Sequence, residues 1–244
     1  MAGKDKAVST SSSDQDIARF VKQAHAVAKH APGSGPAQGR IVFAMDATAS
    51  RQPHWDMAAH IQSEMFDAVA RMGTLDIQLV FFRGFGECKA SGWGRDAGQL
   101  RDKMTAVQCR AGRTQIARVL THVANQNRKH PDQPVNALVY VGDYVEEAAD
   151  DLGHFAAQLG IAGTRVFVFQ DGHDRSAEKI FRDMARLGNG AFARLDGTAA
   201  SVLRDLLGAV ASFILGGFDA LTDYNKTKSS ADIRFLTDQL RRKN

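Results

Sequence analysis

The sequence is poor in cysteine, and its two thiols, Cys88 and Cys109, are too few for a disulfide framework. Residues 1–6 lack the apolar core of a secretory signal. No apolar run reaches the length of a membrane span, since the run Leu203–Leu215 is too short and is interrupted by charged residues. We therefore expect a cytoplasmic protein with no membrane span and with both cysteines reduced.

A strong excess of one charge is also missing. The 31 basic and 27 acidic residues leave a net charge of +4, and the basic residues form no long run. This mild excess permits an acidic partner but does not require nucleic acid, and an aromatic–basic motif is lacking, so we expect no nucleic-acid partner. A chain of 244 residues with 44% hydrophobic and 24% charged residues can hold one large α/β domain with appendages.

Several catalytic patterns are absent. The eight histidines form no His-Glu-x-x-His pair, which argues against a zinc hydrolase. The first strand is not followed by the glycine-rich turn of a dinucleotide-binding fold. Cys109 has no base near it in sequence, which disfavours a nucleophilic role.

The segment that begins at Arg40 combines a buried strand with a set of oxygen donors. Ile41–Met45 is an unbroken apolar run, typical of a strand covered on both faces. Asp46, Thr48 and Ser50 follow it at i, i+2 and i+4, a spacing that lets their side chains converge in a turning loop. Carboxylate and hydroxyl oxygens suit Mg²⁺ or Mn²⁺, and ligands of open α/β sheets sit at the carboxyl ends of strands. The alternative is an Asp/Ser/Thr turn that caps the next helix.

Two further segments strengthen the metal interpretation. Thr114 follows a glycine-containing loop at the start of an amphipathic helix, and Asp143 follows the apolar strand 135–142. With the three segments in this order, residues 40–215 resemble the von Willebrand factor type A domain. The resemblance implies a metal-ion-dependent adhesion site whose metal ligands are Asp46, Thr48, Ser50, Thr114 and Asp143.

Three positions depart from the pattern of this family. Thr48 replaces the middle serine and keeps the hydroxyl, whereas Arg113 and Tyr144 stand where glycine is frequent. None of these changes removes an oxygen donor from the implied site.

The resemblance also implies a mode of binding. Mg²⁺ prefers six oxygen ligands, so five protein donors leave a position that an Asp or Glu side chain of a partner protein would complete. We therefore expect a metal-dependent interaction module rather than an enzyme, with a partner-binding rim of Arg51, His54, Trp55, Arg113 and Tyr144. Trp55 is equally expected as a core residue of the first helix.

The alternative function is a metal-dependent hydrolase or phosphatase that uses the same site. Such an enzyme needs a general base or nucleophile beside the metal. The three loops supply no clear one, because Asp46 and Asp143 already act as ligands.

Composition and periodicity predict four regions: a disordered segment 1–13, a helix and linker at 14–39, the α/β domain at 40–215, and a linker with a short helix at 216–244. The domain should be doubly wound, with a mostly parallel six-stranded sheet, one antiparallel edge strand and helices on both faces. Its strands are expected at 41–45, 76–82, 87–93, 135–142, 165–169 and 190–194, and its helices at 53–72, 95–107, 114–129, 148–159, 176–186 and 199–215. The polar residues 225–230 predict a linker. After it, the stripe of Ile233, Leu236 and Leu240 predicts a helix that folds back on the domain, in preference to a docking helix.

Overall fold

The computed structural model describes residues 38–49, 74–95, 102, 106–195, 199–228 and 230–242. The predicted disorder at 1–13, the helices at 14–30 and 53–72, and most of the helix at 95–107 lie outside these residues. Ser50, Arg51, His54 and Trp55 lie outside them too. The domain boundaries therefore stay a prediction.

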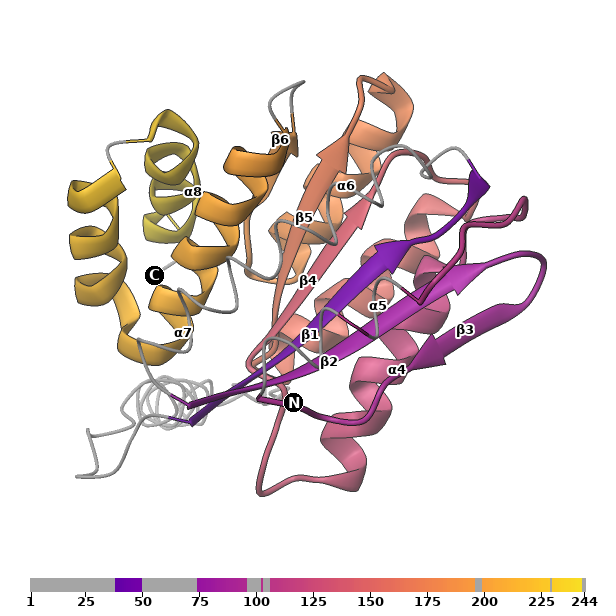
Figure 1. Cartoon of the computed structure of the whole chain (residues 1–244), viewed down its shortest axis with the longest axis horizontal. Coiled ribbons are helices and arrows are strands. Elements are labelled where there is room, and N and C mark those ends of the chain that lie inside the picture. The colour runs from indigo at the N-terminus through magenta and orange to yellow at the C-terminus, as the bar shows by residue number, and fades with distance from the viewer. Residues whose placement is uncertain are drawn as a thin grey trace, which may run out of the picture. The chain divides into compact units, whose positions relative to one another are not determined.

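Six strands form one sheet in the order β3-β2-β1-β4-β5-β6 (Figure 1). β3 pairs antiparallel with β2 at one edge, and the other neighbours pair in parallel, which confirms the predicted fold class. The strands are β1 (Gln38–Asp46), β2 (Thr74–Arg83), β3 (Glu87–Ala90), β4 (Ala137–Gly142), β5 (Arg165–Asp171) and β6 (Phe192–Leu195).

Helices cover both faces of the sheet (Figure 1). Because side chains alternate along a strand, Val42 and Ala44 of β1 pack in one core and Ile41, Phe43 and Met45 in the other. The first core is shared with α4 (Ile116–Lys129), α5 (Ala149–Ile161) and α6 (Arg175–Leu187), and the second with α7 (Ala199–Lys228) and α8 (Ala231–Arg241).

The helix α7 is a helical hairpin. Its helix is broken at Gly216 and at Gly217, where φ is +65° and ψ is −151°. Beyond the break the chain folds back, because a Cβ placed on Gly208 would lie 2.1 Å from the hydroxyl oxygen of Tyr224. The ion pair of Lys228 with Asp205, at 3.4 Å, joins the two ends of the hairpin.

This hairpin corrects one prediction. The break at Gly216 and Gly217 falls where the sequence predicted the helix to stop, but the expected polar linker 225–230 is wrong over 225–228, which are helical. The physical reason is the stripe of Phe218, Leu221 and Tyr224, which packs on the core shared with α7 and holds the polar residues that follow in a helix.

The helix α8 folds back on the domain, as predicted. Ile233, Leu236 and Leu240 are fully buried in the core that α7 and the sheet also line. The amide side chain of Gln239 accepts a hydrogen bond from the Phe192 N–H at 3.0 Å and donates one to the Phe192 carbonyl at 2.8 Å. The last helix thus occupies hydrogen-bonding groups of the edge strand β6.

By length and composition alone, Val202–Lys228 could cross a membrane, which corrects the expectation that no segment reaches that length. Half of its most apolar window is buried inside the domain. Leu206, Ala209 and Val210 are completely buried, and the helix breaks at Gly217. This packing accounts for its apolar composition as that of a core helix.

Candidate metal and partner-binding site

The two predicted aspartates lie at the ends of neighbouring strands. Met45 of β1 pairs with Val141 of β4, so Asp46 and Asp143 come one and two residues beyond the same pair at the carboxyl edge of the sheet. Asp46 is fully buried, and its Oδ1 accepts a hydrogen bond from the Thr48 N–H at 2.7 Å. This local bond turns the chain directly after β1.

The second predicted segment lies beside the first. The Arg110 N–H donates to the Ala47 carbonyl at 3.0 Å, and Thr48 forms a parallel bridge with Arg110. A few residues on, a Cβ on Gly112 would lie 2.1 Å from the Gly84 carbonyl oxygen in the β2–β3 turn. Glycine at 112 therefore permits the close packing of this loop on the β2–β3 turn.

The third segment is joined to the second by Glu146 and Glu147. The Thr114 N–H donates to Glu146 Oε2 at 2.9 Å, and the Glu146 N–H donates back to Thr114 Oγ1 at 3.0 Å. Glu147 accepts hydrogen bonds from the N–H groups of Ile116 and Ala117 at 2.7 and 2.8 Å. The loop after β4 thereby caps the amino end of α4, where unpaired N–H groups and the helix dipole favour a carboxylate.

Sequence reasoning missed both glutamates. Two acids just before a helix are typical of the first turn of that helix, α5, and nothing local indicates that they cap α4 instead. The contact depends on β4 ending next to the start of α4, which is a property of the sheet order.

The structure thus brings the segments that carry Asp46, Thr48, Thr114 and Asp143 together at the carboxyl ends of β1 and β4. Thr48 and Thr114 are buried there, with 9% and 8% of their surface exposed. Of the predicted rim, Arg113 is exposed and Tyr144 is 48% exposed, and the rim role of both stays a prediction.

The donor set fits a hard divalent cation by its chemistry. Carboxylate and hydroxyl oxygens are the ligands that Mg²⁺ and Mn²⁺ prefer, and a hydroxyl that has accepted one hydrogen bond, as that of Thr114 has, keeps a lone pair. Within the described part of the chain no three His, Cys, Asp or Glu residues form a metal-holding group. That finding leaves the predicted set open, because it contains two carboxylates and otherwise hydroxyls.

An acid at the end of another strand was not predicted either. Asp171 ends β5, is buried, and follows Gln170, which pairs with Gly142. Its sequence signal is the one used for Asp46 and Asp143, an apolar strand that ends in an acid. Because the described acids form no three-membered metal group, Asp171 does not extend the predicted ligand set.

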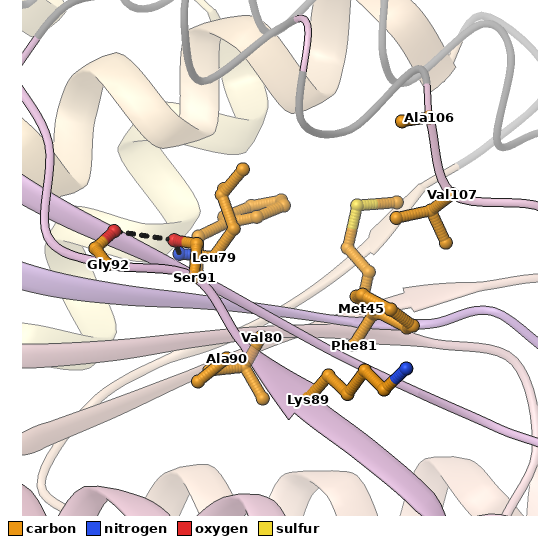
Figure 2. A pocket seen from close by; sticks show the side chains of 11 residues that line it. Met45, Leu79, Val80, Phe81, Lys89, Ala90, Ser91, Gly92, Ala106 and Val107 are labelled. Carbon is orange, nitrogen blue, oxygen red and sulfur yellow. Dashed lines mark hydrogen bonds between the residues drawn. The ribbon is translucent and has the colours of Figure 1, made fainter.

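An apolar cavity of about 390 Å³ lies on the α7 face of the sheet, over β1, β2 and β3 (Figure 2). Met45, Phe81 and Val107 line it, and Lys89 is the charged residue of its lining. Lys89 pairs with Glu87 at 2.9 Å. The cavity therefore offers apolar surface rather than catalytic groups.

Cys88 and Cys109 are both partly buried and form no disulfide. Burial raises the pKa of Cys88, which disfavours its thiolate and hence a nucleophilic role.

No protein-family model and no curated protein sequence matches this chain. Solved structures do match. A von Willebrand factor type A protein from Catenulispora acidiphila aligns with a TM-score of 0.58 at 16% identity, over 72% of this chain and 43% of that chain. The fold is that of a von Willebrand factor type A domain.

Two other solved structures share this von Willebrand factor type A fold. The pilus adhesin SpaC from Lactobacillus rhamnosus aligns with a TM-score of 0.57 at 11% identity, over 77% of this chain and 30% of that chain. The manganese-loaded TRAP protein of Plasmodium vivax aligns with a TM-score of 0.51 at 15% identity, over 70% of this chain and 74% of that chain. At these identities the likeness shows the fold alone, and this chain spans less than half the length of the first two structures.

Proposed function

We propose that this protein is a metal-dependent interaction module that binds an Asp or Glu side chain of a partner protein through Mg²⁺ or Mn²⁺. The observation that carries the proposal is the meeting of three donor-bearing segments at the carboxyl edge of β1 and β4. Hydrogen bonds from Arg110 to Ala47 and between Thr114 and Glu146 hold these segments together. We propose that the protein acts in the cytoplasm.

The roles of the residues follow from charge and ligand number. Asp46 and Asp143 would supply the two negative charges, and Thr48, Ser50 and Thr114 would supply neutral hydroxyl oxygens. When bound, the cation supplies a positive centre with a free coordination position. A partner carboxylate would add one charge and one ligand.

The fold neighbours support this proposal by analogy. TRAP binds manganese in its solved structure and SpaC is a pilus adhesin, and both have this fold. A shared fold alone does not fix function, so the argument depends on the donor residues of this chain.

The hydrolase alternative is weakened by the same hydrogen bonds. A general base must be available to take a proton beside the metal. Glu146 and Glu147, the carboxylates nearest in sequence to Asp143, accept one and two backbone N–H groups. Either side chain would have to share or give up these bonds to act as a general base.

The test compares Asp46→Asn with the wild type by calorimetry and thermal melting in Mg²⁺, in Mn²⁺ and with chelator. An asparagine keeps the size of the side chain and an Oδ1 that can accept the Thr48 N–H, so the fold should persist. We expect a metal-dependent rise in melting temperature for the wild type, as binding to the native state requires, and none for Asp46→Asn.

Two control variants sharpen this test. Thr48→Ser should keep the metal effect, since the hydroxyl remains. Asp132→Asn should keep it too, because Asp132 is exposed in the turn before β4, at the amino ends of the strands and away from the site. Absence of divalent binding at millimolar metal would overturn the proposal. Metal-dependent turnover of a phosphoester or peptide that Asp46→Asn abolishes would support the hydrolase instead.

A further inference from the structure

The turn between β2 and β3 displays an aromatic side chain to solvent. Phe85 is 83% exposed, between Gly84 and Gly86. Gly84 has a φ of +61°, a conformation that favours glycine. Burying a phenylalanine stabilises a fold by about 1.5–3 kcal/mol. Phe85 contributes little of this because it faces solvent, in a turn that a polar residue could form equally well.

Hydrogen bonds from the neighbouring loop and helix hold this turn. The Arg113 N–H donates to the Gly84 carbonyl at 3.1 Å, and Gln115 Nε2 donates to the Arg83 carbonyl at 3.2 Å. Arg118 Nη1 donates to the Gly86 carbonyl at 2.6 Å. Phe85 is therefore exposed on a fixed backbone, and its contact with a partner would cost little ordering entropy.

The turn lies at the same edge of the sheet as the candidate metal site. The loop that carries Arg113 and Thr114 bonds to Gly84 on one side and to Glu146 on the other. Figure 1 shows the β2–β3 turn next to the end of β1. Tyr144, 48% exposed, comes from the loop that holds Glu146.

Two exposed arginines at this edge can pair with an acidic partner, and a bound cation would offset the charges of Asp46 and Asp143. Arg110 and Arg113 are exposed in the loop between the two aromatic residues. The nearby Glu146 and Glu147 accept backbone N–H groups from residues 114–117 of the neighbouring segment. Aromatic residues and arginine are also the types most enriched among the residues that dominate interface energies.

We propose that Phe85 and Tyr144 form the apolar part of the partner-binding surface, and that the partner segment carries an apolar side chain close to its acidic residue. This inference rests on the proposed function, because the acidic residue is the one that the metal would bind. It adds a specificity determinant, since the metal alone would not distinguish one exposed carboxylate from another.

The probe is a library of random peptides displayed on phage, selected on the full chain in Mn²⁺ or Mg²⁺. The enriched peptides should contain an acidic residue near an aromatic or aliphatic one. A synthetic copy of the most enriched peptide is then titrated against each variant. We expect Phe85→Ala to weaken its binding about tenfold or more and Tyr144→Ala several-fold, as for central interface residues.

The chain offers matched controls. Ile161 is 86% exposed at the end of α5, where the strands begin, and Phe235 is 49% exposed on α8. Ile161→Ala and Phe235→Ala remove similar exposed apolar surface elsewhere and should leave the affinity within about twofold, as surface changes outside an interface do. Equal melting temperatures of all four variants would show that the fold is intact.

The outcomes separate the two proposals. Peptide binding that is lost in Asp46→Asn but kept in Phe85→Ala would overturn this inference and leave the proposed function standing. Enriched peptides that lack an acidic residue, or that bind equally well in chelator, would overturn both. Failure to enrich any peptide over an Asp46→Asn background would also count against both.

Discussion

Glu146 and Glu147 join the second and third loops of the candidate site. The Glu146 carboxylate accepts the N–H of Thr114, and the Glu147 carboxylate accepts those of Ile116 and Ala117. The backbone N–H of Glu146 returns a bond to Thr114 Oγ1. Hydrogen bonds to charged groups are stronger than neutral ones, and these lie within a loop anchored by the buried Val145. The position of Thr114 is thus fixed by residues that are not predicted ligands.

Another carboxylate, that of Glu87, gives a pH prediction at the scale of one residue. Arg83 Nε donates to Glu87 Oε2 at 2.8 Å and Lys89 Nζ lies 2.9 Å from Oε1. These bonds, that of Arg83 foremost, lower the pKa of Glu87 to about 2. Because the folded pKa is below the ordinary value of 4.5, the favourable contribution of Glu87 is present above about pH 4.5 and is lost as pH falls toward 2.

An NMR titration of the Glu87 side-chain carboxyl checks this expectation. Arg83→Gln should raise the pKa toward the ordinary value, and Lys89→Gln should raise it less, since the Arg83 bond is the larger cause. A wild-type pKa near that of a free glutamate would contradict the prediction.

At the scale of elements, apolar runs, or alternation in the case of β3, predicted the strands, and periodicity predicted α4, α5 and α6, all to within a few residues. Those signals are local, because a buried parallel strand must be apolar throughout and a surface helix must be amphipathic. The helical segment 218–228 escaped prediction because its polar end resembles a linker. It is helical because Tyr224 packs against Gly208, a contact between residues on opposite arms of the α7 hairpin.

The turn of that hairpin carries the prediction for this scale. Gly217 has φ +65° and ψ −151°, a conformation that residues with a Cβ avoid. Gly217→Ala should lower the free energy of unfolding by about 1–3 kcal/mol, measured by chemical denaturation. Gly92→Ala is the control, because a Cβ would meet nothing within 4 Å at either position and Gly92 has an ordinary φ. Equal effects of the two substitutions would show that the backbone at Gly217 carries no strain.

For the molecule as a whole, the sequence predicted that β1 and β4 end next to donors, but it missed Asp171 at the end of β5 and the contacts that join the loops. Asp46 and Asp143 were found because each follows an apolar run. Gly112, Glu146 and Phe85 were missed because their roles depend on which loops the strand order β2-β1-β4 brings together. Such contacts leave no periodic signal in the sequence.

The last prediction concerns the core that α8 completes. Leu236 is fully buried among residues of α7 and the sheet, whereas its neighbour Phe235 is 49% exposed. Leu236→Ala should therefore lower the free energy of unfolding by about 2–4 kcal/mol, since it removes buried methyl groups and leaves a cavity, and Phe235→Ala should change it by less than about 0.5 kcal/mol. Chemical denaturation followed by both fluorescence and circular dichroism should give one shared transition for each variant, because α8 packs in the same core as β1 and β4. If Leu236→Ala cost no more than Phe235→Ala, or if it split the transition in two, α8 would be an appendage rather than part of the cooperative domain.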